Sequence, residues 1–120
     1  MKKKPICLID SGVGGFSILQ KLQEQFPYED FVYILDDKHF PYGNKTQEEL
    51  DSVFLENLAR ARTFDPKIII LACNTLSSLY MNREKEEDDI FAIIHPTISY
   101  MNQYFDHKDI LLLGTPFTPA

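Results

Sequence analysis

Short, fully apolar runs alternate along the chain with longer segments in which apolar residues recur every three or four positions. The apolar runs predict strands at 6–10, 31–36, 67–72, 89–94 and 109–114. The periodic segments predict helices at 16–26, 46–62, 75–87 and 98–105. Strands that are apolar throughout are typical of a parallel sheet covered on both faces by helices. The pattern therefore predicts an α/β fold, a three-layer sandwich with a mainly parallel sheet of the flavodoxin-like or doubly wound kind.

The segment 46–62 carries the clearest helix signal. Thr46 and Glu49 have the spacing of a capping box, in which each residue satisfies a backbone amide of the other. Apolar residues from Leu50 to Ala61 then recur at helical spacing and form one stripe. We expect this stripe to pack against the sheet.

Composition and charge limit the classes of function. The chain has 120 residues, of which 44% are hydrophobic, and this is enough for one ordinary core. A formal net charge of -6 argues against binding to nucleic acid or to an anionic membrane surface. No apolar run reaches the roughly 20 residues that cross a bilayer, and no secretory signal follows the lysines at 2–4. A soluble cytoplasmic protein is therefore expected.

The two cysteines call for different interpretations. They are too few for a disulfide framework and lack the spacing of a zinc site, so no metal is expected. Cys7 lies within an apolar run and is predicted to be an ordinary buried thiol. Cys73 follows a predicted strand, where ligands bind in parallel sheets. It is either a buried thiol at the edge of the core or a functional one, because the next helix, capped by Asn74 or Thr75, would favour the thiolate that acts as base or nucleophile.

Polar residues follow each predicted strand and should gather at one edge of the sheet. They are Asp10, Ser11, Asp36, Asp37, Cys73 to Thr75, His95, Gly114 and Thr115. The glycines at 12, 14 and 15 have two interpretations: they permit a tight turn, or their amides and Ser11 hold a carboxylate. A nucleotide site is not favoured, because Ser17 occupies the third glycine position of the dinucleotide motif.

The segment 40–46 combines proline, glycine and asparagine and is predicted to be a loop. Tyr42 in this loop either packs or presents its hydroxyl to a ligand. His39 and His107 are expected to be exposed loop residues.

Four segments together resemble glutamate racemase, of the aspartate/glutamate racemase family. They are "IDSGVGGFSIL" (9–19), "PYGNKT" (41–46), "LACNT" (71–75) and "LLGTPFT" (112–118). The resemblance runs along almost the whole chain. It implies the first lobe of a two-lobed racemase fold, with 1–95 forming an α/β lobe that holds the Cys73 site and 96–120 the incomplete start of a second lobe.

The resemblance also implies a function. Family members interconvert L- and D-glutamate for peptidoglycan synthesis without a cofactor, using two cysteines on opposite faces of the substrate. Cys73 matches the first of these bases, and the Cys-Thr-His segment that holds the second is absent, so the chain is expected to be truncated. The implied substrate-binding residues are Asp10, Ser11, Tyr42, Gly43, Asn74, Thr75, Thr115 and Thr118.

Alternatives to this function stay open. The chain could be a non-catalytic remnant or a carboxylate-binding protein that keeps the pocket without the two-base chemistry. Within the enzymes, an aspartate racemase or a hydrolase with Cys73 as nucleophile is the other candidate. The expected partner is a small-molecule substrate, glutamate, and a homodimer is kept open.

Overall fold

A computed structural model describes residues 3–39, 42–83, 87, 89–104, 109 and 111. Its strands are β1 (Ile6–Asp10), β2 (Phe31–Leu35), β3 (Ile68–Leu71) and β4 (Ile90–Ala92). Its helices are α1 (Phe16–Gln25), α2 (Gln47–Arg62), α3 (Asn74–Met81) and α4 (Ile94–Tyr104), with a 3₁₀ turn η1 (Tyr42–Asn44). All four strands are parallel. The predicted α/β fold class is confirmed.

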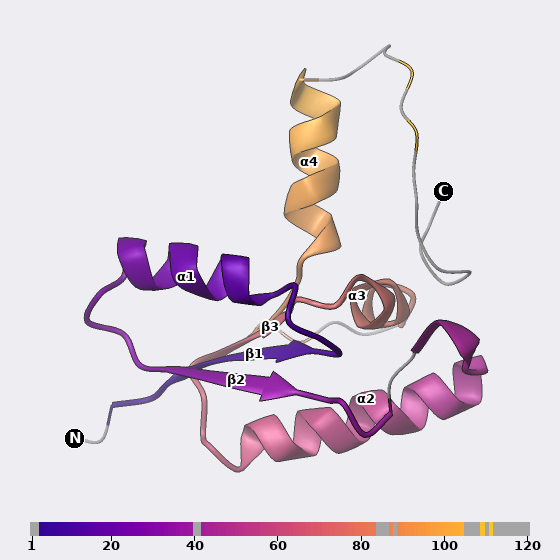
Figure 1. Cartoon of the computed structure of the whole chain (residues 1–120), viewed down its shortest axis with the longest axis horizontal. Helices are drawn as coiled ribbons and strands as arrows, with labels where there is room; N and C mark the ends of the chain where they lie inside the picture. Colours follow the sequence, from indigo (N-terminus) through magenta and orange to yellow (C-terminus); the bar gives the residue numbers. More distant parts are fainter. Residues whose placement is uncertain are drawn as a thin grey trace.

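The strand order β2-β1-β3-β4 contains a topological switch between β1 and β3. From β1 the chain runs to β2, which lies on one side of β1 in the sheet. From β2 it crosses over to β3, which lies on the other side of β1. Helix α1 covers one face of the sheet and α2 lies on the opposite face (Figure 1). Ile9 pairs with Leu71, and the Ala72 amide donates a hydrogen bond to the Ile9 carbonyl at 2.9 Å. The residues that follow β1 and β3 therefore lie side by side at the switch point, where ligands bind in such folds.

The main core lies between the sheet and the pair α2 and α3. Cys7, Ile9 and Leu71 contribute from the strands, while Phe54 and Leu76 contribute from the two helices. The capping box predicted at the start of α2 is confirmed, and this helix buries most of its apolar stripe. The core holds the ends of β1 and β3 in fixed register.

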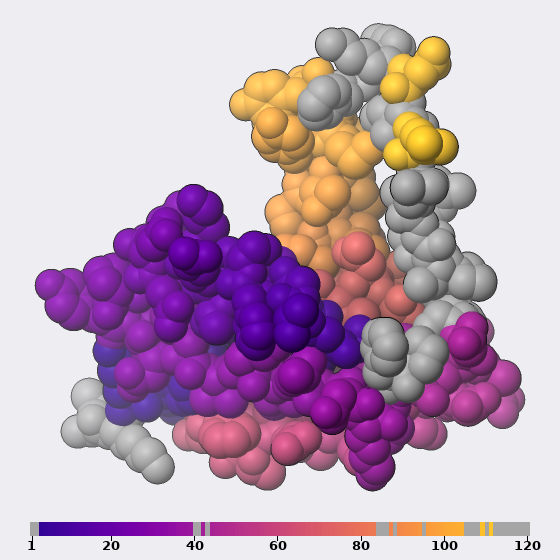
Figure 2. All heavy atoms as spheres, viewed as in Figure 1, coloured from indigo at the N-terminus to yellow at the C-terminus, as the bar shows by residue number. Residues whose placement is uncertain are grey.

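Among the described elements, α1 is the helix that lies on the opposite face of the sheet (Figure 1). This helix has no fully buried residue, and Phe16 and Phe26 at its two ends are about half exposed. Phe91 of β4 is also exposed on the sheet. Helix α4 rises away from the body of the protein beside α1 (Figure 2). Among the described residues, no helix is both long enough and apolar enough to cross a membrane.

Several predicted boundaries differ from the observed ones. The strand predicted at 89–94 ends at Ala92, and the helix predicted from 98 begins at Ile94. Pro96 is compatible with the earlier start, because proline fits the first turn of a helix, where its missing amide would have no intrahelical partner. Helix α3 ends at Met81, before the acidic residues that would oppose its dipole. His95 therefore lies in α4 rather than in a loop.

Two predictions concern the end of the chain. The fifth strand, at 109–114, falls mostly outside the described residues, and Asp109 and Leu111 lie in no regular element. The boundary predicted between residues 95 and 96 falls within the continuous helix α4. The division into a first lobe and the start of a second stays a prediction.

Candidate functional site

Ser11 and Cys73 meet at the switch point of the sheet. Ser11 directly follows β1, and Cys73 comes two residues after β3. The Ser11 hydroxyl lies 3.7 Å from the Cys73 thiol, within hydrogen-bonding distance for sulfur. Cys73 is 7% exposed, and Ser11 is half-buried. A thiol and a hydroxyl from distant parts of the sequence thus share one partly sheltered position.

Asp10 is an anchor for the loop that carries Ser11. Its Oδ1 accepts a hydrogen bond from the Ser11 amide at 2.8 Å, and its Oδ2 accepts one from the Gly15 amide at 2.7 Å. The Tyr33 hydroxyl donates to the same Oδ2 at 2.9 Å. Asp10 thus joins both ends of the loop to β2.

Close packing explains why one position of the loop after β1 is a glycine. No described glycine has a positive φ, so none is required here for a left-handed backbone. A Cβ atom on Gly15 would lie 2.5 Å from the Tyr33 hydroxyl, whereas one on Gly12 or Gly14 would meet nothing within 4 Å. Two of the loop amides, those of Ser11 and Gly15, bind the internal carboxylate of Asp10. The loop therefore does hold a carboxylate, and it belongs to the protein itself.

A second buried carboxylate, Asp36, follows β2 and organises the next loop. Its Oδ2 accepts hydrogen bonds from the Tyr42 hydroxyl at 2.5 Å and from Asn57 Nδ2 at 2.8 Å. Burial opposes ionisation of Asp36, but the hydrogen bonds from Tyr42, Asn57 and His39 outweigh it, and the pKa of this carboxyl lies below its usual range. Tyr42 is 3% exposed, so its hydroxyl serves this internal network.

His39 corrects an expectation from the sequence. It was expected to be an exposed loop residue, but its side chain is only 20% exposed and lies between two carboxylates. Its Nδ1 lies 2.9 Å from Asp36 Oδ2, and its Nε2 lies 3.2 Å from Glu56 Oε2. The expectation was wrong because sequence position alone does not reveal the acidic neighbour on α2. His107 lies outside the described residues.

The start of α3 also differs from its prediction. Asn74 or Thr75 was expected to cap the helix, but Cys73 is the N-cap residue, and its side chain makes no capping hydrogen bond. Asn74 and Thr75 are the first two helical residues, the former exposed and the latter 5% exposed. Cys73 therefore stands at the positive end of the helix dipole, which favours a negatively charged group.

The pKa values of two tyrosines, Tyr33 and Tyr42, respond to a charge on Cys73. Burial raises the pKa of Tyr33, and the hydrogen bond to Asp10 and a charge on Cys73 add to this effect. Burial also raises the pKa of Tyr42, with contributions from Asp36 and then from a charge on Cys73. Both phenols therefore stay neutral hydrogen-bond donors well above neutral pH.

The other predicted residues are placed as follows. Gly43 lies in η1, directly after Tyr42. Thr115 and Thr118 lie outside the described residues. Cys7 is fully buried in the middle of β1, as predicted, and burial raises the pKa of its thiol. Among the residues that the structure describes, no group of three or more His, Cys, Asp or Glu side chains could hold a metal ion.

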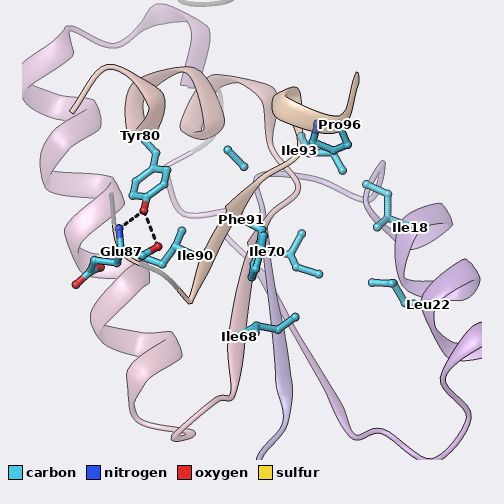
Figure 3. A pocket seen from close by; sticks show the side chains of 11 residues that line it. Ile18, Leu22, Ile68, Ile70, Tyr80, Glu87, Ile90, Phe91, Ile93 and Pro96 are labelled. Atoms are coloured by element: carbon cyan, nitrogen blue, oxygen red, sulfur yellow. Dashed lines mark hydrogen bonds between the residues drawn. The ribbon is translucent and has the colours of Figure 1, made fainter. Parts of the chain in front are cut away.

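A groove on the described surface lies away from the Ser11 and Cys73 position. It has a volume of about 630 Å³ and is lined mainly by apolar side chains, among them Ile18 and Leu22 of α1, Ile70 of β3 and Phe91 of β4. Figure 3 shows these side chains converging on the face of the sheet that α1 leaves open. None of the described residues predicted for the site lines this groove, so the groove is separate from the position that Ser11 and Cys73 share.

Sequence reasoning missed two residues of the site, Tyr33 and Asn57. Tyr33 lies within an apolar strand and gave no separate signal. Asn57 is 3% exposed on the buried face of α2. A polar residue within the apolar stripe of that helix was the available signal, because buried amides require hydrogen-bond partners.

The fold and the site define an α/β protein with a thiol at the topological switch point of a parallel sheet. Comparison with known proteins adds a family resemblance, although no family model matches the chain. The chain is 33% identical over 120 residues to the glutamate racemase of Clostridium acetobutylicum, covering 98% of this chain and 47% of that protein. It is 35% identical to the glutamate racemase of Limosilactobacillus reuteri, covering 98% of this chain and 45% of that protein.

Solved structures give the same result. The glutamate racemase of Aquifex pyrophilus superposes with a TM-score of 0.83 at 31% identity, over 93% of this chain and 45% of that one. The isoform RacE1 from Bacillus anthracis gives 0.78 at 29% identity, over 88% of this chain and 41% of that one. The predicted resemblance to glutamate racemase is confirmed. The chain spans about half the length of the curated relatives it matches.

Proposed function

We propose that Cys73 is one acid–base group of a glutamate racemase site. The contact between the Ser11 hydroxyl and the Cys73 thiol, 3.7 Å apart at the switch point, carries the proposal. The similarity to glutamate racemases supports it. One glutamate racemase of known structure, from Francisella tularensis, is described in complex with D-glutamate, which supports this substrate class.

The proposed reaction begins with proton abstraction. The Cys73 thiolate takes the α-proton of glutamate, and the electron pair of the broken C–H bond moves onto the α-carbon and its carboxylate. Neutral donors near the substrate carboxylate stabilise this developing charge. The Ser11 hydroxyl, the exposed Asn74 amide and those glycine-loop amides that do not bind Asp10 are suited to this role, without a cofactor.

Inversion requires a second acid on the opposite face of the α-carbon. Cys7 is unsuited, because it is fully buried in β1 and its thiol faces the Ala61 carbonyl at 4.0 Å. We propose that a separate residue delivers the second proton, as in a two-base site. In the cell this reaction would supply D-glutamate for peptidoglycan in the cytoplasm.

Isotope exchange tests the proposal. The protein is incubated with L-glutamate in heavy water, and loss of the α-proton signal is followed by NMR together with optical rotation. We expect Cys73→Ser to lower the exchange rate by about a hundredfold to ten-thousandfold. We expect Cys7→Ala to leave the rate unchanged. Both results together would support Cys73 as a base. Exchange without inversion would indicate one working base.

The same assay separates the alternatives. Absence of exchange at every pH, with glutamate still protecting Cys73 from alkylation, would favour a carboxylate-binding protein. Faster exchange of aspartate than of glutamate would favour an aspartate racemase. Undiminished exchange in Cys73→Ser would remove Cys73 from the mechanism.

A further inference from the structure

The loop that leaves β2 is held by buried polar groups from three parts of the chain. Asp36 follows β2, Tyr42 begins η1, and Asn57 lies on α2. Their exposed fractions are 4%, 3% and 3%. Polar groups buried to this extent destabilise a fold unless they are hydrogen-bonded. The hydrogen bonds among these three side chains are therefore needed to stabilise this conformation.

The three side chains satisfy one another. Tyr42 and Asn57 both donate to Asp36 Oδ2, at 2.5 and 2.8 Å, and Asn57 Nδ2 also lies 3.2 Å from the Tyr42 hydroxyl. Hydrogen bonds to an ionised carboxylate are roughly twice as strong as neutral ones. His39 closes the outer side of the group, because its backbone amide donates to Asp36 Oδ1 at 3.2 Å.

Tyr42 connects this group to the buried cluster that contains the thiol. Tyr42 and Cys73 belong to one buried cluster that also contains Val53 and Leu76. A charge on Cys73 contributes to the raised pKa of Tyr42, after burial and Asp36, as expected for near neighbours. We therefore expect movement of η1 away from α2 to open this cluster and to expose Cys73 more.

We propose that Asp36, Tyr42 and Asn57 form a clamp that positions η1 against the Cys73 thiol. Asp36 and Asn57 are positioning residues, because they act through Tyr42 and do not reach the thiol. The clamp keeps Cys73 covered and sets the path of the backbone at Gly43. Its consequence for glutamate rests on the proposed function, whereas its effect on access to Cys73 does not.

The test compares the alkylation rates of the two cysteines with iodoacetamide. Cys7 is fully buried and reports global opening, so the ratio of the Cys73 rate to the Cys7 rate reports opening of the loop alone. Asn57→Leu and Tyr42→Phe each remove one donor to the carboxylate. We expect each variant to raise the ratio about tenfold to hundredfold, the range for one hydrogen bond to a buried charge. Lys38→Gln is the matched control, since it removes only an exposed ion pair.

The outcomes decide between the proposal and its rejection. An unchanged ratio, or equal acceleration of both cysteines, would overturn the clamp. If either variant does not fold, His39→Gln provides a milder change at the same carboxylate and is expected to shift the ratio in the same direction.

Glutamate protection separates the clamp from the proposed function. In the wild-type chain, glutamate should slow alkylation of Cys73, and the clamp variants should need more glutamate for the same protection. If wild type is not protected, the proposed function fails, while the ratio still decides on the clamp. If the ratio of alkylation rates rises but the variants need no more glutamate than wild type for the same protection, the role of the clamp in glutamate binding is rejected.

Discussion

Replacing Gly15 with alanine is expected to destabilise the fold at the loop that carries Ser11. The new Cβ would lie 2.5 Å from the Tyr33 hydroxyl, 2.8 Å from Asp10 Oδ2 and 3.2 Å from the Ala72 Cβ. Separations below 3.0 Å require the neighbours to move. The two nearest atoms are hydrogen-bonded to each other at 2.9 Å, so neither moves without affecting the other.

Two effects set the size of the expected loss in the free energy of unfolding. Overpacking a well-packed site costs about 1–3 kcal/mol. Displacement of the Tyr33 hydroxyl from the Asp10 carboxylate costs about 1.5–3 kcal/mol, the range for a hydrogen bond to a charged group. Because moving Tyr33 relieves part of the overlap, the costs do not add fully, and we expect a total of about 2–5 kcal/mol. This is a large share of the roughly 5–15 kcal/mol that stabilises a typical domain.

Urea unfolding followed by circular dichroism measures the effect, since the chain contains no tryptophan. Gly12→Ala and Gly14→Ala are matched controls, because a Cβ at either position meets nothing within 4 Å. They should change the free energy of unfolding by no more than about 1 kcal/mol, in the stabilising direction. In a Tyr33→Phe background, Gly15→Ala should cost less than in wild type. A Gly15→Ala cost no larger than that of Gly14→Ala would refute the reasoning.

Two further predictions concern stability. Ser78→Ala should raise the free energy of unfolding by up to about 1 kcal/mol, because its buried hydroxyl has no hydrogen-bond partner among the described residues. Ser77→Ala should lower the free energy of unfolding by about 1–2 kcal/mol, because that hydroxyl donates to the Leu71 carbonyl and accepts from the Ile93 amide. Equal effects of the two serine changes in urea titrations would contradict both predictions. The lowered pKa of Asp36 gives a contribution to stability that is complete above its ordinary value of 3.8 and is lost as pH falls below it. Unfolding measured from about pH 5 to about pH 3 should therefore show a smaller acid loss in Asp36→Asn than in wild type, and an identical loss would contradict the assigned hydrogen bonds.

The fold could be predicted from the sequence because its signals are local and agree with one another. The apolar runs marked the four described strands to within about two residues. The capping box at Thr46 and Glu49 marked the start of α2 within one residue. Predicted ends were less accurate where competing rules applied, as at Pro96, which suits a first helical turn as well as a loop.

The site was only partly predictable. Strand ends and family motifs indicated Ser11 and Cys73, because their positions follow from topology. The partners of Asp36 could not be predicted in the same way: Tyr42 and Asn57 come from separate elements, and only tertiary packing brings them to one carboxylate. His39 was misjudged for the same reason.

Asp10 and Asp36 play parallel roles on neighbouring strands. Each follows a strand, and the Asp36 amide donates to the Asp10 carbonyl at 2.8 Å, so the two residues are adjacent. Each carboxylate accepts a hydrogen bond from a tyrosine hydroxyl and from a backbone amide of the loop that follows it. Internal donors therefore engage both negative charges, and the loop that Asp10 holds presents the Ser11 hydroxyl to Cys73. These hydrogen bonds offset the cost of burying the two carboxylates, and those at Asp10 fix the loop that places the Ser11 hydroxyl beside the thiol.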